Sequence, residues 1–243
     1  MASPVALQND KHRNLKITES GDYARYKDQH LIPIISQDFF TLCAEFPVVF
    51  VKDSNGEQFV SVAIMGLREG QNLYCQTEEW NAHVVPVRFN NAPFSMVRVD
   101  AESDQLAVLV DEDSPMLSET EGTPLFKEDG TKSEYLEQKI ERLLKTAEQT
   151  VQTEGICKIF KEKDLLATQQ LQMQHRQDSP AYNIAGIYTI DEKKLNALSD
   201  EDYLDLRKKG MIPLIYAHLS SLQQLRRISE MQYNADKAAE TSA

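Results

Sequence analysis

The sequence is short of glycine and cysteine, and each shortage excludes a class of function. Only 9 of its 243 residues are glycine, and neither GxGxxG nor GxxxxGK[ST] occurs. The chain therefore gives no support for dinucleotide or P-loop nucleotide binding. Its three cysteines, Cys43, Cys75 and Cys157, are widely spaced and form no CxxC pair. Because an odd number cannot all pair within one chain, we expect reduced thiols, as in a cytoplasmic protein.

Long apolar runs and an excess of basic charge are also missing. No stretch approaches the roughly 20 apolar residues of a membrane span, and the first 20 residues hold no apolar segment of signal-peptide length. We predict no transmembrane segment and a cytoplasmic location, and leave signal-independent export open. Lys plus Arg number 26 against 38 Asp plus Glu, a net charge of −12. This balance argues against nucleic acid and anionic lipid as partners, because both require a cationic face.

Recognisable catalytic and metal motifs are absent too. The histidines show neither H-x-H nor H-x-x-x-H spacing and no HExxH, so we predict no metal ligands. No GxSxG motif presents a serine beside His218. Cys75 and His83 are eight residues apart and could form a thiol–imidazole pair, although a structural cysteine is the favoured interpretation. We predict no catalytic residue and no cofactor; a non-catalytic protein is favoured, and the question of an enzyme stays open.

The densest β signal lies in residues 46–110. An Asn-Gly pair at Asn55 and Gly56 suits a tight hairpin turn between two apolar runs. The whole stretch predicts an antiparallel meander of about five strands. The expected strands are Val48–Val51, Gln58–Met65, Leu73–Cys75, Phe94–Val99 and Leu106–Val110. Between Asp100 and Glu121 lie eight acidic residues and no basic one; we favour a solvated surface over a calcium site or a surface for a basic partner.

Helical patterns dominate the second half. Thr131–Glu134 fits a capping box and predicts a helix over Lys132–Thr153. Gly155 should interrupt or end it, with a second helix over Ile156–Gln174. Further expected elements are a helix Gln37–Glu45 capped by Ser36, a strand Tyr182–Ile190, two short helices capped by Asp191 and Ser199, and a last helix from near Pro213.

These elements together predict an α+β fold. An antiparallel sheet of five or six strands in the N-terminal half would pack against amphipathic helices from the C-terminal half. The expected organisation is a flexible segment 1–20, one domain over 21–232 and a polar tail 233–243. Within the domain, residues 46–110 are β-rich and residues 131–232 are mainly helical.

The only tryptophan marks the segment that we regard as the candidate contact region. Trp80, Asn81, His83 and Pro86 lie between the two predicted hairpins, and His218 is added from the last helix. A lone tryptophan beside a proline is more often a core plug than a ligand platform. A core position is therefore favoured for the tryptophan, and Trp80 stays among the candidate binding residues with Asn81, His83, Pro86 and His218.

Several short motifs, in order and spacing, resemble the SapC family of bacterial proteins. They cover about residues 20 to 230. The motifs are FPVVF from Phe46, AIMGL from Ala63, GQNLY from Gly70, WNA from Trp80 with Pro86, APF from Ala92, PLF from Pro124 with Asp129-Gly130, AGIY from Ala185 and LIYAHLSSL from Leu214. The chain departs from the pattern at Phe89–Ala92, where the family often has an aromatic and paired arginines.

The resemblance implies a setting rather than a chemistry. The family is named for a gene beside a surface-layer secretion system, and similar genes are found near flavin-dependent halogenase-like genes and outer-membrane receptors. The first hypothesis is therefore an accessory protein that binds a surface or secreted polypeptide. The second is an enzyme with a site around Trp80, Asn81, His83 and His218, and the third is a structural subunit of a surface lattice. No catalytic residues can be carried over from the family.

Overall fold

The computed structural model describes residues 4–18, 23–76, 79–99, 105–176 and 181–241. The chain forms two compact units, each built from two stretches of sequence. The first unit consists of residues 1–23 and 87–148, and the second of residues 24–86 and 149–243. The fold class is the predicted one: antiparallel sheets combine with helices that lie mainly in the C-terminal half.

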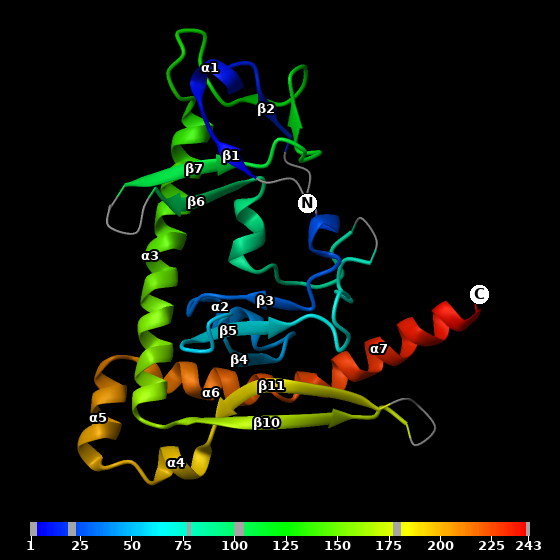
Figure 1. The fold of residues 1–243 in the computed structure, drawn as a ribbon, viewed down its shortest axis with the longest axis vertical. Coiled ribbons are helices and arrows are strands. Elements are labelled where there is room, and N and C mark those ends of the chain that lie inside the picture. The colour runs from blue at the N-terminus through cyan, green and yellow to red at the C-terminus, as the bar shows by residue number, and fades with distance from the viewer. Residues whose placement is uncertain (1–3, 19–22, 77–78, 100–104, 177–180, 242–243) are drawn as a thin grey trace. The chain divides into compact units, whose positions relative to one another are not determined.

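The first unit contains two small sheets. One has the order β1-β7-β6, from strands Val5–Ala6, Leu106–Val110 and Phe94–Arg98, and the other has the order β8-β2-β9, from Leu117–Ser118, Lys16–Ile17 and Thr123–Pro124. The first unit also contains the short helices α1 (Asn9–His12) and η2 (Val87–Asn91) and the first part of the long helix α3 (Glu134–Glu162) (Figure 1). Phe94 pairs with Val110, and both lie in a core with Leu125 and Leu136.

The described part of residues 1–20 forms two short strands and a short helix. Val5 pairs with Val110, and Lys16 pairs with both Ser118 and Pro124. Ile17 is buried in the core of the unit. These strands have two residues each, which is too short for an alternating pattern to show in the sequence.

The second unit is organised around a five-stranded antiparallel sheet of order β10-β11-β4-β5-β3. Its strands are β3 (Leu31–Pro33), β4 (Val48–Lys52), β5 (Phe59–Ile64), β10 (Leu166–Met173) and β11 (Tyr182–Ile190). The predicted hairpin between β4 and β5 is confirmed, with Gly56 at φ 73° in its turn. The predicted strand Tyr182–Ile190 is also confirmed, and it joins this sheet beside β4.

The prediction of one continuous meander over residues 46–110 is wrong. β6 and β7 pair as predicted, but they belong to a sheet of the first unit; the turn predicted over Asp100–Asp104 lies outside the described residues. Leu73 and Tyr74 form a turn instead of a strand. Tyr74 is fully buried and its ring packs edge-on against Phe46 at 4.7 Å between centroids. Its backbone N–H donates to Asn72 Oδ1 at 3.0 Å and its carbonyl oxygen accepts the N–H of Asn81 at 2.8 Å, so these groups bond within the turn and not to a neighbouring strand.

Helix α3 (Glu134–Glu162) corrects two expectations. It continues through Gly155, and the stretch predicted as a second helix to Gln174 forms β10 instead. The cap is Ser133, whose Oγ accepts the backbone N–H of Leu136 at 3.2 Å. Thr131 donates to Asp129 at 2.6 Å instead of capping the helix.

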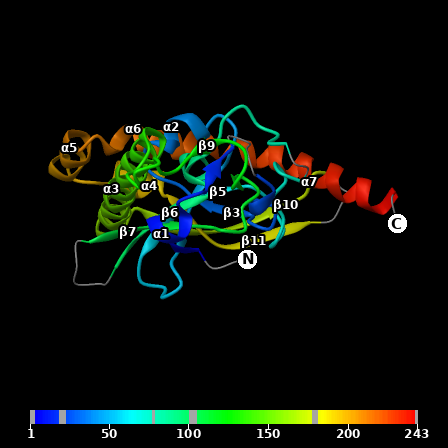
Figure 2. The same cartoon turned by 90° about the horizontal axis from the view of Figure 1, so that it is seen from above.

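The second unit contains six further helices among the described residues. They are η1 (Ala24–Tyr26), α2 (Asp38–Leu42), α4 (Glu192–Asn196), α5 (Asp200–Lys208), α6 (Met211–Ser221) and α7 (Gln224–Thr241). Of these helices, α6 contacts β4 and β11 of the sheet. The predicted caps Asp191 and Ser199 are confirmed. The prediction of a single last helix is wrong, because this stretch forms two helices, α6 and α7. Helix α6 packs against α2 (Figure 2).

The start of α2 also differs from its prediction. Ser36 does not cap the helix but donates its backbone N–H to Thr153 Oγ1 at 2.8 Å. The helix is only five residues long, and Phe40 within it is 55% exposed. Helix α7 extends through Thr241, so most of the polar stretch 233–243 is helical.

Candidate functional site

The Trp80–Pro86 segment in the second unit rests on an aromatic cluster. The Trp80 ring lies 6.1 Å from that of Phe46 and 5.8 Å from that of Tyr74, measured between centroids. Its indole Nε1 donates to the carbonyl oxygen of Val84 at 2.8 Å, so the ring closes a turn within its own segment. The backbone N–H of Asn81 donates to the carbonyl oxygen of Tyr74 at 2.8 Å. The half-buried tryptophan therefore anchors the segment.

A single carboxylate, that of Glu45, holds the other end of the segment. Glu45 Oε2 accepts the backbone N–H groups of His83 at 2.9 Å and of Val84 at 3.4 Å. Glu45 Oε1 lies 2.5 Å from His83 Nδ1. The Glu45 side chain is only 9% exposed, whereas that of His83 is 92% exposed. The Glu45 carboxylate is thus largely shielded from water, whereas the His83 imidazole is exposed to water.

The charge on Glu45 is stabilised by these donors. Burial alone would raise the pKa of the carboxyl group, but the hydrogen bonds from His83 and Val84 outweigh burial. Arg227, whose Nη1 lies 3.8 Å from Glu45 Oε1, acts in the same direction, and the net pKa of Glu45 is below its usual value. An ionised carboxylate accepts hydrogen bonds more strongly than a neutral one, so this state suits the segment's N–H groups.

Tyr74 supports Glu45 from beneath. Its hydroxyl donates to the backbone carbonyl oxygen of Glu45 at 3.3 Å. Burial, partly offset by the charge of Arg227, raises the pKa of Tyr74 to about 12. The phenol therefore remains a protonated donor throughout the physiological pH range.

The predicted contact residues separate into three groups. Asn81 and His83 are exposed, Trp80 is half-buried and Pro86 is buried. His218 is fully buried elsewhere in the same unit: its Nδ1 lies 2.7 Å from the carbonyl oxygen of Val48, and its Nε2 accepts the N–H of Ile190 at 3.1 Å. These contacts link α6 to β4 and β11. His218 thus has sheet residues as its partners, while His83 has Glu45.

The sequence analysis identified neither Glu45 nor Arg227 as part of the site. One signal was present: Glu45 is the only charged residue between Asp38 and Lys52. An isolated acid within an apolar stretch is usually buried with partners, because an unpaired buried charge is costly. Which partners it binds was not legible, since His83 lies 38 residues away.

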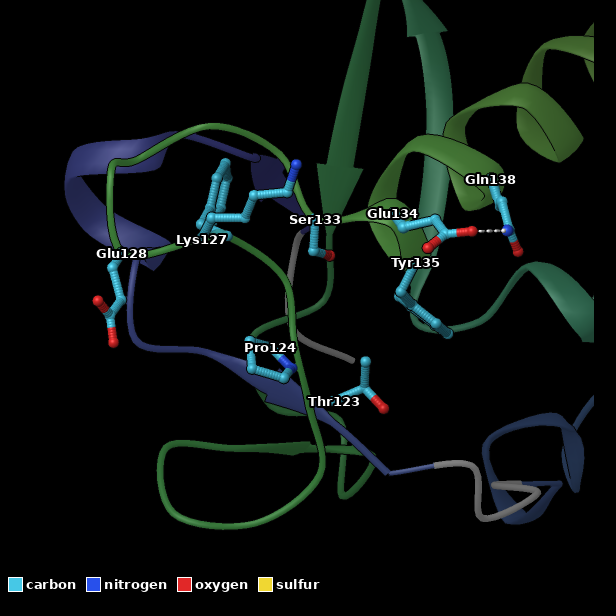
Figure 3. A pocket seen from close by; sticks show the side chains of 9 residues that line it. Thr123, Pro124, Lys127, Glu128, Ser133, Glu134, Tyr135 and Gln138 are labelled. Carbon is cyan, nitrogen blue, oxygen red and sulfur yellow. Dashed lines mark hydrogen bonds between the residues drawn. The ribbon is translucent and has the colours of Figure 1, made fainter.

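Two pockets lie outside the Trp80–Pro86 segment, and none of its residues lines them. One, of about 510 Å³ in the first unit, lies between the start of α3 and the β9 region and includes Tyr135, Pro124 and Thr123; Gln138 donates to Glu134 at 3.3 Å at its rim (Figure 3). The other, of about 460 Å³ in the second unit, is lined by charges that pair with one another, as Lys163 does with Asp202 at 2.5 Å.

Within the described residues, no three His, Cys, Asp or Glu side chains gather in a way that would hold a metal ion. In that same part of the chain, none of the helices combines the length and apolar character that crossing a bilayer requires. Cys43, Cys75 and Cys157 are free thiols. Burial raises the pKa of Cys75 to about 11, which opposes the thiolate that a Cys75–His83 pair would need.

What the site can do chemically follows from the Glu45–His83 pair. A carboxylate on Nδ1 fixes the ring orientation and favours the tautomer with Nε2 free of hydrogen. That nitrogen can accept a hydrogen bond from a partner. With Asn81 beside it, the segment offers a rigid polar surface on an aromatic base.

The fold and this segment define the class: an α+β protein of antiparallel sheets that presents a fixed polar connector. Comparison with known families is specific, because the profile of the SapC family matches residues 7–228. The chain therefore belongs to the SapC family, as the motifs in its sequence indicated. No curated protein and no solved structure gives a significant match.

Proposed function

We propose that this chain is a non-catalytic accessory protein of the cytoplasm that binds a surface or secreted polypeptide through the Trp80–Pro86 segment. The observation that supports it most is the latch formed by Glu45, whose carboxylate accepts three donors from two adjacent residues. Such a latch fixes the segment before a partner arrives, and preorganisation lowers the entropic cost of binding. The role in surface-layer protein formation or transport rests on the family alone.

Side-chain exposure separates the residues of the segment that can contact a partner from those that hold its backbone in place. Asn81 and the imidazole of His83 project into solvent, while Trp80 and Pro86 hold the backbone in place. A polypeptide partner would therefore be contacted by amide and imidazole hydrogen-bonding groups. His218, fully buried, would contribute to stability rather than to contact.

Site-specific photo-crosslinking tests this proposal. A benzophenone amino acid is placed at Asn81 and, as a matched control, at the exposed Asn183 of β11 in the same unit. We expect a discrete crosslinked polypeptide from position 81 and none from position 183. Introducing Glu45→Gln should reduce that crosslink strongly while leaving the far-UV circular dichroism spectrum unchanged. Equal labelling from both positions, or no labelling from position 81, would contradict binding through this segment.

An enzyme remains the second candidate, and one observation favours it. The 2.5 Å contact between Glu45 Oε1 and His83 Nδ1 resembles the way carboxylates orient a catalytic base. The 92% exposure of the His83 side chain argues the other way, because reactions of this kind profit from excluding water. Turnover of any substrate that is lost in His83→Ala and retained in Asn81→Ala would support the enzyme instead.

A further inference from the structure

We propose that β10 of this chain pairs edge to edge with β10 of a second copy, giving a two-fold symmetric dimer. β10 is the terminal strand of the five-stranded sheet, and among the described residues only β11 pairs with it (Figure 1). The outer N–H and C=O groups of such a strand are a template for another strand. A second copy supplies a strand of identical length and composition.

The two edges of this sheet differ in how they are protected. At the opposite edge, β3 has three residues and contains Pro33, two features that blunt an edge. β10 has eight residues, LATQQLQM, with no proline and no charged side chain. The extra residue of the irregularity in the hairpin belongs to β11, near Gly186 at φ 75°, so β10 is not the bulged strand. Within the described residues, β10 therefore has neither the short length, the proline, the charge nor the bulge that can protect an edge strand.

Charge selects the second copy as the occupant and fixes the register. The chain carries −12 overall, so two copies repel unless they meet at a neutral surface. Residues 165–174 contain no charged side chain. Antiparallel pairing centred on Gln170 brings Asp164 opposite Arg176 of the other copy; within its own chain the 83% exposed Asp164 side chain pairs with Lys194 at 2.7 Å, and Arg176 lies over the ring of Tyr233, so the cross-copy pairs would add to these contacts. The two-fold axis makes this complementarity occur twice.

The same register matches the exposed polar side chains. With Gln170 opposite its own copy, Thr168 lies opposite Gln172, and all three are exposed on one face. Cross-strand pairs of uncharged hydrogen-bonding side chains stabilise antiparallel strands. The arrangement is isologous and closes on itself, so it yields dimers and does not propagate into a lattice.

Sedimentation equilibrium of the full chain at increasing concentration tests the proposal. We expect a reversible monomer–dimer equilibrium. Gln170→Lys places two like charges face to face at the axis and should raise the dimer dissociation constant at least about fivefold. Asn183→Lys is the matched control: Asn183 is exposed and pairs with Gln172 from β11, one strand in from the edge, and this variant should dimerise like the wild type.

A charge exchange tests the register. Asp164→Lys and Arg176→Glu should each weaken the dimer, and the double variant should recover wild-type affinity to within about twofold. Asp164 has φ 52°, so its replacement strains the backbone in single and double variant alike, and strain cannot explain recovery. A monomer at every concentration overturns the proposal, as does a dimer that Gln170→Lys leaves unchanged. Failure of the double variant to recover overturns the register.

Discussion

At the residue scale, Glu45 and His218 illustrate two ways in which one polar side chain can organise distant backbone. Glu45 accepts N–H groups of a segment 38 residues further on, and His218 joins the carbonyl oxygen of Val48 to the N–H of Ile190. Both side chains are largely or fully buried. For His218, loss of the imidazole would leave buried partners unsatisfied, which costs more than the bond itself contributes. For Glu45 the N–H groups that lose their acceptor are only partly buried.

The latch at Glu45 can be followed through Trp80, because the sequence has one tryptophan. We expect Glu45→Ala to free His83 and Val84 from their acceptor and to shift the fluorescence emission of Trp80 to longer wavelength as the segment takes up water. Far-UV circular dichroism should stay unchanged. Glu57→Ala, at an exposed position of the β4–β5 turn, is the control. An unchanged emission spectrum in Glu45→Ala would show that the aromatic cluster alone fixes the segment.

His218 should make stability depend on pH. Burial, partly offset by the bond to Val48, lowers the pKa of His218 from 6.5 to about 4. Between these values the unfolded chain binds a proton that the folded chain does not, so the free energy of unfolding falls as pH drops from about 6.5 to about 4. The loss is on the order of 3 kcal/mol. The neutral form also fits the geometry, because Nε2 acts as an acceptor.

Urea unfolding at pH 7 and pH 4.5 measures this contribution. His218→Gln has no proton to gain and should lose less stability between the two pH values than the wild type, although it starts from a lower value. His175→Gln, which removes the histidine whose ring lies 5.1 Å from that of Tyr233 in the same unit, is the matched histidine control. Equal losses in His218→Gln and wild type would assign the acid sensitivity to other groups.

At the element scale, local signals predicted β4, β5, β11 and the caps at Asp191 and Ser199. They failed for β10, because Leu, Ala, Gln and Met favour helix and the strand exists through pairing with β11. The local signals also failed at Gly155, where a glycine was expected to interrupt or end the helix and does not. A glycine weakens a helix by roughly 1 kcal/mol, which the 29 residues of α3 can tolerate.

Gly155 is therefore a place where the chain can be stabilised. Among the described atoms, none lies within 4 Å of where a Cβ would stand, and the residue is helical. Gly155→Ala should raise the free energy of unfolding by about 0.5–1 kcal/mol. Gly186→Ala has equally open space but φ 75°, so it should lower stability by about 1 kcal/mol. Opposite signs in urea unfolding are expected; a destabilised Gly155→Ala would mean that α3 needs flexibility there.

At the scale of the whole molecule, the order of the strands could not be derived from the sequence. β1 pairs with β7 across roughly a hundred residues, and β6 and β7 leave the sheet formed by β4 and β5. Strands of two residues carry no periodicity, and no local pattern records which sheet a hairpin joins. For the candidate segment, the sequence indicated that Trp80 would pack against other side chains, while the partnership of Glu45 with His83 depends on such long-range folding.

The two units are interleaved in sequence, and we expect them to unfold together in a single cooperative transition. The boundary between residues 148 and 149 falls inside the continuous helix α3. Unfolding one unit alone would cut that helix and leave its backbone groups without intrahelical partners at the cut. We therefore expect damage in the first unit to reach a reporter in the second.

Leu125→Ala provides this damage, and Trp80 provides the reporter. Leu125 is fully buried in the core of the first unit, so its truncation should cost about 2–5 kcal/mol. If unfolding is cooperative, the urea midpoint read from Trp80 fluorescence falls together with the midpoint read from circular dichroism. Lys132→Ala, exposed in the same unit, should leave both midpoints unchanged. A Trp80 midpoint that does not move in Leu125→Ala would mean that the units unfold independently, and α3 would then act as a linker between two domains.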